Sequence, residues 1–581
     1  MPSPATCRLA SLDEQIAAQH AVIARFDTAL WENGFNAALL PAYQSAWRRL
    51  ETLLAKRDDP RHHFVIVIPV ADSPAQLQRC LASLLELCRA FAYGGMKNGY
   101  FSKVSVLLAD DSESTETIAA NQALVGEFTA KGLAIEYFGL SEQLALLDTL
   151  PDLDLSHIIG NAPREAFGHK GQAIMRNLAY LHLAQRQQSD EPLLVYTLDA
   201  DQQFKVNVDT ADGDVCAVNF FAQLDAIFSA SDADVLTGKV VGDPPVSPAV
   251  MAGTFLDDVA GFLHEMAASD PAQPYYQNAA NTSEADAAYH DMAGLFGFEN
   301  PADAYRYRCS LPDAPSNADC FGDFARRLKS FFHGEHPTRI TWYRHQPALD
   351  SVQPARTVYT GNYVFHPRAL HWFIPFAPLR LRMSGPTLGR LMKAELGPRF
   401  ISANLPMLHT RTLGATGAAE FRPGVVTEVD HIDLTDEFER QFFGDVMLFA
   451  VERLTARGFP QQTLSGEMLA TTLDAVHAEM ALKYRTRHAK IMSMLTALTR
   501  LLDEPTHWWH LPEHAESLTC FGVFLDNMQR NFGKDSPAHA RIASNTNWQS
   551  WRQRQLAALT RFHADRRVWN QALAALKPPS A

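Results

Sequence analysis

Continuous apolar runs divide the first part of the chain into regular units. Runs of consecutive, mostly β-branched residues are typical of strands buried on both faces, as in parallel sheets. After the first run, Leu77, Leu81 and Leu84 recur at helical spacing. Ser73 followed by Pro74 is a typical start for that helix, with Ser73 as its N-cap. The alternation predicts βαβ units with right-handed crossovers. The predicted strands cover 64–69, 104–109, 133–138 and 193–198, and weaker strand patterns follow at 357–365 and 400–408.

Helical patterns flank this α/β region on both sides. Ser11 and Glu14 have the spacing of a capping box, in which each side chain bonds the other residue's amide. Further on, Phe438, Phe442 and Val446 follow one helical face. The predicted fold is therefore an α/β core with a mostly parallel sheet and helical extensions. Its predicted parts are a helical N-terminal extension at 1–60, an α/β domain at 61–430 with an insertion or acceptor region of loops and short helices at 242–355, and a helical C-terminal domain at 431–581.

Composition and charge exclude several kinds of protein. Hydrophobic residues make up 47% of the chain and charged residues 20%, as in a globular and not a disordered protein. The net charge is −14 and no basic stripe is present, so a nucleic-acid partner is excluded. The seven cysteines are scattered and form no CxxC pair. This predicts neither a disulfide framework nor a zinc site, and it fits a reducing cytosol.

The location expected from the sequence is cytoplasmic. No run of about 18 apolar residues occurs, so no membrane span is expected. The N-terminus lacks the basic-then-apolar layout of a signal peptide. We interpret the pair Trp508-Trp509 as a packing anchor, and peripheral contact with the inner face of a membrane is the alternative.

Acidic residues follow the predicted strands, at the edge of a parallel sheet where ligands bind. Asp110 and Asp111 end the second strand, and Asp199 and Asp201 follow the fourth. Asp-x-Asp occurs four times in the chain, but only the 199/201 pair directly follows a buried strand. The other pairs are 152/154, 212/214 and 232/234.

The Asp199-Ala200-Asp201 arrangement suits the binding of a metal and a diphosphate. Carboxylate oxygens hold hard divalent cations such as Mn²⁺ or Mg²⁺, which keep open positions for phosphate. Such a cation neutralises the charge that develops on a diphosphate leaving group. Lys170 and Arg176 lie in a glycine-containing segment upstream of the fourth strand, and their charges suit phosphate. Taken alone, the Asp pair is equally well read as a strand-end turn.

Four motifs in order make this sequence resemble glycosyltransferases of the GT-A fold, particularly family 2. They are Pro69 after the first strand, Asp110-Asp111-Ser112-Glu113-Ser114 after the second, Arg176-Asn177, and Asp199-Ala200-Asp201. The resemblance covers 62–205 well and 356–412 loosely. It implies that Pro69 lines the base pocket, that Asp111 contacts the base or ribose, with Asp110 beside it, and that Arg176 lies near the nucleotide. It also implies that Asp201 binds the metal with the help of Asp199.

A late histidine extends the resemblance, and a missing acidic motif limits it. Many GT-A enzymes complete metal or phosphate binding with a late His, and His409 ends the last predicted strand. The alternative is an ordinary surface or core histidine. Inverting members of family 2 usually carry a late acidic motif, but 380–390 contains no carboxylate. The catalytic base is therefore unidentified, with Asp350 and Asp323 among the candidates. In that segment Arg382 and Arg390 could bind an anionic acceptor or the diphosphate, or form a basic helix face.

The sequence thus predicts a metal-dependent glycosyltransferase. Its donor is expected to be a nucleotide-diphosphate sugar, with a hexose as the expected sugar, and its cofactor Mn²⁺ or Mg²⁺. The acceptor is unidentified, with a cell-surface glycan or glycolipid precursor as one class, and inversion or retention stays open. The helical extensions could serve as oligomer contacts. A degenerate transferase-like scaffold is the non-enzyme alternative, and a sugar nucleotidyltransferase is the second enzyme alternative, which the glycine-free turn 70–73 disfavours.

Overall fold

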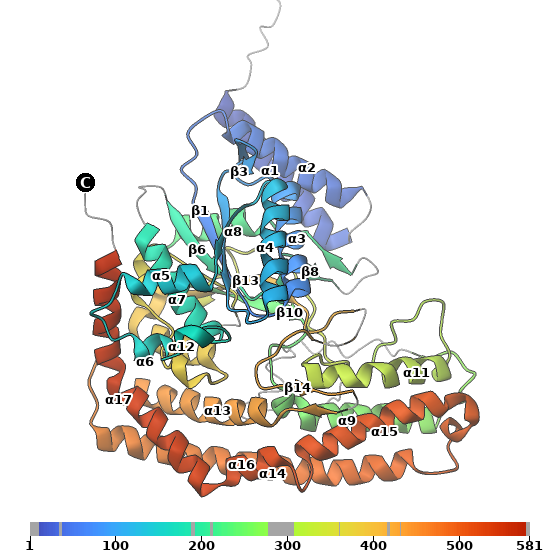
Figure 1. Cartoon of the computed structure of the whole chain (residues 1–581). Coiled ribbons are helices and arrows are strands. Elements are labelled where there is room, and N and C mark those ends of the chain that lie inside the picture. Colours follow the sequence, from blue (N-terminus) through green and yellow to red (C-terminus); the bar gives the residue numbers. More distant parts are fainter. Residues whose placement is uncertain are drawn as a thin grey trace, which may run out of the picture.

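The computed structural model describes residues 11–33, 38–186, 192–208, 213–276, 307–358, 361–414, 417, 419–429 and 431–576. Within these ranges a nine-stranded sheet forms the centre of the protein (Figure 1). Its order is β11-β13-β10-β12-β6-β1-β4-β5, and the short strand β7 pairs with β13. Strands β6, β1, β4 and β5 are mutually parallel, and so are β10 and β13, whereas β12 runs antiparallel to both of its neighbours.

The observed strands agree with most of the predicted ones. The four early runs become β1, β4, β5 and β6, and the run at 400–408 becomes β13. The pattern at 357–365 yields only the short β12, and residues 359–360 lie outside the described part. The sheet strands are β1 (His63–Val70), β4 (Val104–Asp110), β5 (Ala134–Phe138), β6 (Leu193–Thr197), β7 (Gln202–Gln203), β10 (Val235–Gly242), β11 (Gln353–Pro354), β12 (Tyr363–Phe365) and β13 (Phe400–His409). Short two-stranded pairs are formed by β2 (Met96–Lys97) with β3 (Tyr100–Phe101), β8 (Val206–Asn207) with β9 (Asp214–Val215), and β14 (Val426–Thr427) with β15 (Ile432–Asp433).

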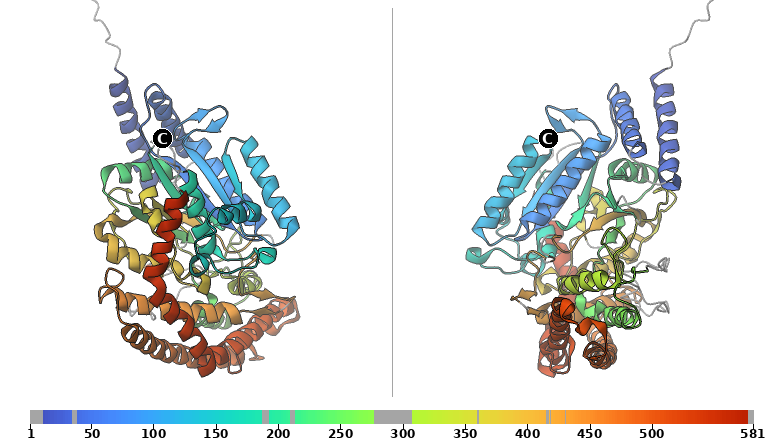
Figure 2. Two further views of the ribbon diagram at one scale, coloured as in Figure 1. Left: turned by 60° about the vertical axis from the view of Figure 1, so that its left-hand side comes forward. Right: turned by 90° about the vertical axis from the view of Figure 1, so that its right-hand side faces the viewer.

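Two hydrophobic cores cover the two faces of the sheet. Successive residues of a strand point to opposite faces, so Ile66 and Ile68 of β1 belong to one core and Val67 to the other. The first core is closed by α1 (Leu12–Asn33), α2 (Leu39–Leu54), α3 (Pro74–Phe91), α4 (Thr115–Ala130) and α8 (Phe220–Ala230). The second extends from the sheet into the C-terminal helices, at the bottom of Figure 2. Its helices include α5 (Leu140–Asp148), α6 (Ser156–Ile159), α7 (Gln172–Arg186), α12 (Ser384–Leu396), α13 (Thr435–Thr455), α14 (Gly466–Leu502), α15 (Ala515–Phe532), α16 (Pro537–Ala543) and α17 (Asn545–Leu576).

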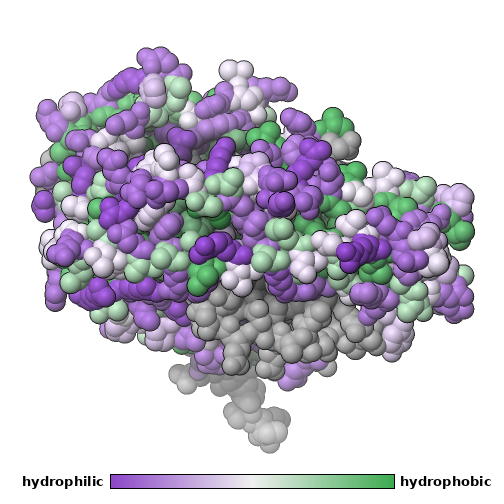
Figure 3. All heavy atoms as spheres, turned by 90° about the horizontal axis from the view of Figure 1, so that it is seen from below, coloured by the Kyte–Doolittle hydropathy of each residue, from purple (hydrophilic) through white to green (hydrophobic). Residues whose placement is uncertain are grey.

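The fold-class prediction is confirmed: an α/β core with a mostly parallel sheet carries helical extensions on both sides. The capping box also forms, because Ser11 N donates to Glu14 Oε2 (2.7 Å) and Glu14 N donates to Ser11 Oγ (3.2 Å). Within the described ranges, no helix is both long and apolar enough to cross a membrane. On the face seen in Figure 3, hydrophilic side chains dominate and the apolar ones are scattered among them.

The region after β10 contains long helices, in contrast to the loops and short helices that we predicted. Helix α9 (Pro248–Ala267) has 20 residues and packs against α14, and α11 (Asn317–Arg327) packs against α15. Most of the α9 surface is buried, including Phe255, Val259 and Phe262. A helix buried on several sides lacks the polar stripe from which a surface helix is recognised. Residues 277–306 of the predicted insertion lie outside the described part.

The tryptophan pair is a packing anchor, as the sequence indicated. Trp509 is fully buried, donates through Nε1 to the Leu502 carbonyl oxygen (3.1 Å) and stacks on Phe321. Trp508 is half-buried and donates to the Met266 carbonyl oxygen (2.8 Å). The pair therefore joins α9 and α11 to the C-terminal helices.

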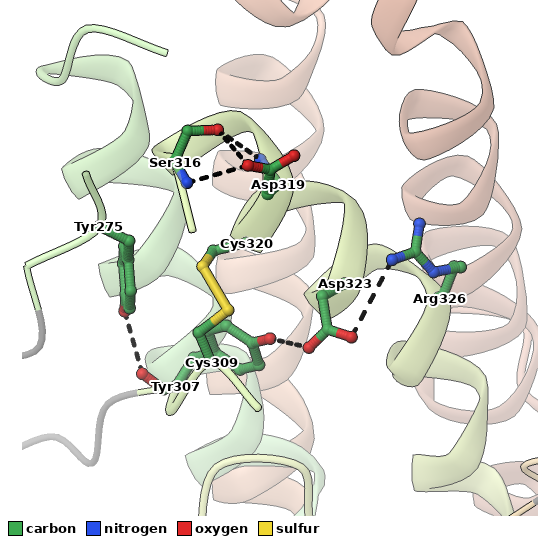
Figure 4. Close-up of a disulfide and its surroundings, with 8 residues drawn as sticks. All are labelled: Tyr275, Tyr307, Cys309, Ser316, Asp319, Cys320, Asp323 and Arg326. Carbon is green, nitrogen blue, oxygen red and sulfur yellow. Dashed lines mark hydrogen bonds and ion pairs between the residues drawn. A yellow bond between two sulfur atoms is a disulfide. The ribbon is translucent and has the colours of Figure 1, made fainter. Parts of the chain in front are cut away.

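A disulfide joins Cys309 to Cys320 on α11 (Figure 4). The sequence argument predicted no disulfide, and for this pair it was wrong. Spacing alone does not reveal a pair that tertiary packing brings together, here with a Cα–Cα distance of 5.7 Å. Beside the bridge, Tyr307 donates to Asp323 and Tyr275 donates to the Tyr307 carbonyl oxygen. The expectation of a reducing cytosol depended partly on the absence of disulfides, and this bridge removes that support.

A buried ion pair ties α9 to the segment that follows α11. Arg339 donates to both carboxylate oxygens of Asp258, through Nε (2.9 Å) and Nη2 (3.1 Å), and both side chains are almost fully buried. Replacing Asp258 by Ala leaves a buried guanidinium without its carboxylate, so we expect the free energy of unfolding to fall by about 3–5 kcal/mol. Urea denaturation followed by circular dichroism measures this change.

The neighbouring acid provides a matched control. Asp257 forms an ion pair with Lys490 in which both side chains are substantially exposed. Since exposed pairs contribute little, Asp257→Ala should change the unfolding free energy by less than about 1 kcal/mol. Equal effects of the two substitutions would show that the Asp258 pair does not stabilise the α9 packing in the expected way.

Candidate functional site

The two acids at the end of β4, Asp110 and Asp111, differ in their contacts. Asp110 is held by hydrogen bonds from Ser112 N, Asn121 Nδ2 and Tyr137 OH, each 2.9 Å long. These bonds occupy both of its oxygens and shape the turn into α4. The next residue, Asp111, is the one that the turn presents to the carboxyl edge of the sheet.

A buried ion pair orients Asp111. Lys170 Nζ lies 2.6 Å from Asp111 Oδ1, and Gly171 N donates to Asp111 Oδ2 (2.9 Å). The Asp111 and Lys170 side chains are 2% and 1% exposed. Burial lowers the pKa of Lys170, and Asp111 partly opposes that shift. From the sequence we expected Lys170 to contact phosphate, whereas in the structure its ammonium contacts Asp111 and the Phe167 carbonyl oxygen.

The end of β1 is covered by residues that the sequence analysis missed. Pro69 is buried inside the strand, in register with Ala109. The Ser73 hydroxyl does not cap α3 but donates to the Ala71 carbonyl oxygen. Instead, the Glu420 carboxylate accepts hydrogen bonds from Ala75 N (3.0 Å) and Gln76 N (2.8 Å). An anion at a helix N-terminus satisfies amides that lack partners within the helix, so Glu420 supplies the cap from far along the chain.

An aromatic stack lies beside this cap. The ring of His169 stacks on Phe421, with centroids 4.1 Å apart, and bonds Asp72 through Nε2. Both Asp72 (φ 43°) and His169 (φ 47°) adopt left-handed backbone conformations. Such strain in non-glycine residues clusters at functional sites, and here it marks the turns that follow β1 and precede α7.

At the end of β6, Asp199 forms a buried ion pair with Arg176 of α7. Burial favours the neutral acid and raises the pKa of Asp199, although Arg176 opposes that shift. The backbone amide of Asp199 donates to Gln202 Oε1 (3.0 Å). Gly361 (φ 62°) lies so close that a Cβ atom there would be 2.7 Å from Asp199 N. The structure thus brings Arg176 and Asp199 together, and it identifies Gly361 as a residue on which their placement depends.

Asp201 and His409 meet because β7 pairs with β13 directly after the Asp-x-Asp turn. In this register Gln202 lies opposite His409, so Asp201 Oδ2 comes 3.2 Å from His409 Nε2. His409 Nδ1 lies 2.8 Å from the carbonyl oxygen of Asp243, which can only accept. Nδ1 therefore carries a proton, and in neutral imidazole the Nε2 lone pair faces the carboxylate.

The Asp201–His409 contact fits a divalent cation. Neither Asp201 Oδ1 nor His409 Nε2, both buried, has a hydrogen-bond partner among the described residues. The Asp201 carboxylate and the Nε2 lone pair that faces its Oδ2 need a positive charge between them, either a proton or a metal ion, and carboxylate oxygen and imidazole nitrogen are both suitable metal ligands. In the described part of the chain no group of three or more His, Cys, Asp or Glu residues is placed to hold a metal. A metal at this site would thus take two protein ligands and leave positions for a bound anion.

Positive charge also adjoins the Asp201 oxygen that faces His409. Arg411 Nη1 donates to Asp201 Oδ2 (3.2 Å), and its backbone amide donates to Asp243 Oδ2 (2.7 Å). Burial opposes ionisation of Asp201, but a proton shared with His409, together with the charges of Arg411 and Arg422, outweighs burial and holds the pKa of Asp201 well below the usual range. Arg411 could have been recognised from the sequence as a site residue, because it lies two residues after His409. Asp243, directly after β10, could have been found in the same way as the other strand-end acids.

The two candidates for a catalytic base lie apart from these contacts. Asp350 is an exposed residue of the turn before β11. Asp323 of α11 accepts a hydrogen bond from Tyr307 and faces Arg326 (Figure 4). Neither shares a hydrogen bond or ion pair with Asp199, Asp201 or His409 in the described structure. Of the two arginines singled out in the segment 380–390, Arg390 is buried and bonds Glu452 and the Arg356 carbonyl oxygen.

Fold and site together define an α/β protein in which acids lie at the carboxyl ends of a mostly parallel sheet, one of them facing a histidine. No family model and no curated protein matches the chain. Among solved structures it is similar to the mannosyltransferase PcManGT from Pyrobaculum calidifontis in complex with GDP-Man and Mn²⁺, with 10% identity, 90% of this chain and 99% of that chain covered, and a TM-score of 0.30. It is also similar to the apo form of mouse xyloside xylosyltransferase 1, with 14% identity, 35% and 58% covered, and a TM-score of 0.18. At these TM-scores neither similarity supports an assignment of function.

Proposed function

We propose that this protein is a metal-dependent glycosyltransferase that uses a nucleotide-diphosphate sugar. The observation that carries the proposal is the buried pair of facing acceptors, Asp201 and His409, at the carboxyl edge of the sheet. The ordered motifs that resemble family 2 glycosyltransferases lie at the ends of β1, β4 and β6, on the same edge. A diphosphate placed there would reach the metal site.

Roles follow for the predicted metal and nucleotide residues, whereas the catalytic base stays unassigned. Asp201 and His409 would hold Mn²⁺ or Mg²⁺, and the imidazole ligand favours Mn²⁺. The bound ion would neutralise charge on the departing diphosphate. Arg176 holds Asp199 in place, and Lys170 orients Asp111 toward the nucleoside. Pro69 would shape the base pocket from within β1. In the transfer, the bond from the anomeric carbon to the β-phosphate oxygen breaks and a bond to an acceptor hydroxyl oxygen forms.

Nucleotide binding provides the first test. We expect one nucleoside diphosphate, out of UDP, GDP, ADP, CDP and dTDP, to raise the melting temperature in the presence of Mn²⁺ but not with EDTA. Ligand that binds only the folded state stabilises it by about 2.7 kcal/mol at 100 times its Kd. Differential scanning fluorimetry measures the shift. A flat response to every nucleotide, with and without Mn²⁺, would instead favour the non-enzymatic scaffold.

A further inference from the structure

A cluster of arginines lies next to Asp201, on the side of α9 and α13. Arg411 and Arg422 come from the segment after β13, and Arg382 precedes α12. Glu437, in the first turn of α13, is the carboxylate that Arg382 and Arg422 share, because Arg382 Nη1 donates to its Oε1 (2.7 Å) and Arg422 Nη2 lies 3.8 Å from the same oxygen. The sequence analysis singled out Arg382 as a residue that could bind an anion, and the metal site leaves this cluster without a role.

Arg422 lacks adequate partners in this cluster. The Glu437 carboxylate is already occupied by Arg382 on one oxygen and by the Ser247 hydroxyl (2.6 Å) on the other. Both terminal nitrogens of Arg422 are buried and make no hydrogen bond to any described residue. Burial, together with the nearby Arg411 and Arg382, lowers the pKa of Arg422 to about 9. A buried guanidinium without hydrogen bonds is costly, so a missing anion explains the arrangement better than a structural role does.

The place of the cluster in the sheet indicates which anion is missing. Asp111 and Lys170, which the proposed function assigns to the nucleoside, lie at the end of β4 and before α7. The order β13-β10-β12-β6-β1-β4 places three strands between β4 and β10, which leads to Ser247, and four between β4 and β13, which leads to Arg411. Asp201 directly precedes β7, the short strand that pairs with β13, and its Oδ2 accepts a hydrogen bond from Arg411. A donor that runs from Asp111 to a metal on Asp201 leaves Arg422, which makes no hydrogen bond to Asp201, for a further anion, and the acceptor is the other substrate.

We propose that Arg422, together with Arg411, binds a phosphate group carried by the acceptor. This inference rests on the proposed function and adds the substrate class to it. The fork of a guanidinium suits the bidentate recognition of phosphate, and Arg422 has both terminal nitrogens free for it. Arg382 and Ser247 hold Glu437 in place, so that Glu437 orients the cluster without neutralising Arg422.

The test compares two ligands in the full chain. Isothermal titration first measures the Kd of the matching nucleoside diphosphate with Mn²⁺, and then the Kd of inorganic phosphate for the complex saturated with both. We expect Arg422→Gln to leave the nucleotide Kd within about twofold and to weaken phosphate by about tenfold or more, because a charge-assisted bidentate contact is lost. Arg422→Lys, which keeps the charge but not the fork, should weaken phosphate less.

A matched control separates binding from folding. Arg390 is also buried, but it has partners in Glu452 and the Arg356 carbonyl oxygen. Arg390→Gln should therefore lower the melting temperature of the free protein and leave phosphate binding unchanged. Arg422→Gln should keep or raise that melting temperature, because it removes an unsatisfied charge. A fall as large as that of Arg390→Gln would mark Arg422 as structural and contradict the proposal.

The other outcomes are equally decisive. No phosphate binding to the wild-type complex, or equal losses of nucleotide and phosphate affinity in Arg422→Gln, would overturn the acceptor assignment and leave the proposed function intact. No nucleotide binding at all would overturn both. Glycerol 3-phosphate and phosphatidylcholine vesicles containing phosphatidic acid present the same group in soluble and lipid form. Binding of either one that depends on Arg422 supports the proposal and identifies the source, and binding of neither contradicts it.

Discussion

Replacement of Asp201 by Asn is expected to abolish metal-dependent nucleotide binding. The substitution keeps the size of the side chain but removes the negative charge from the oxygens that face His409 and Arg411. We expect the affinity for a nucleoside diphosphate with Mn²⁺ to fall on the order of 100-fold, since the charge term of such a metal amounts to several kcal/mol. Isothermal titration measures the loss, and electron paramagnetic resonance of Mn²⁺ reports whether the metal itself still binds.

A second Asp-x-Asp pair supplies the control for this experiment. Asp232 belongs to the 232/234 pair and lies exposed before β10. Asp232→Asn changes the net charge by the same amount but should leave both titrations unchanged. If Asp201→Asn retained Mn²⁺-dependent nucleotide binding, the metal assignment would be wrong, whatever the protein does.

Gly361→Ala is expected to impair the same site without touching a metal ligand. The left-handed backbone at Gly361 disfavours any other residue, and a Cβ there would lie 2.7 Å from Asp199 N and 2.8 Å from Asp199 Cγ. Asp199 and its partner Arg176 must then shift. We expect nucleotide affinity to fall about tenfold or more and the unfolding free energy to fall by about 1–3 kcal/mol, as measured by titration and by urea denaturation.

The variant Gly95→Ala is the control that distinguishes backbone strain from steric displacement of Asp199. It has a similar conformation (φ 71°), but a Cβ there would meet no atom within 4 Å. Gly95→Ala should therefore cost stability while nucleotide binding stays normal. Equal binding defects in the two alanine variants would show that the contact with Asp199 is not the cause.

The α/β core could be predicted because its strands carry their own signal. The run 64–69 in β1 is apolar on both faces, so neither its type nor its burial depends on distant residues. The strand-end acids followed from the same pattern, because parallel strands deliver their carboxyl ends to one edge. Asp199 and Arg176 indeed meet there. The division of the chain at 60 and 430, and the cytoplasmic location, stay predictions.

What could not be predicted depends on contacts between distant segments. The meeting of Asp201 with His409 requires the β7–β13 register, which no local pattern encodes. The cap that Glu420 gives to α3 joins residues about 345 positions apart. We expected Lys170 to bind phosphate because it is a cation in a glycine-containing segment. Only the fold reveals that Asp111 already neutralises its charge. The reversed strand β12 was likewise too short to indicate its direction.

The last described helix, α17, packs on α7, which itself packs on β1 and β4. Trp569 of α17 is buried and donates to the Leu370 carbonyl oxygen (2.8 Å). In the order of synthesis, α7 follows β1 and β4 closely and can cover them early. The outer side of α7, in contrast, is covered by a helix that lies far later in the chain. The outer layer of this core is therefore completed later than the sheet beneath it.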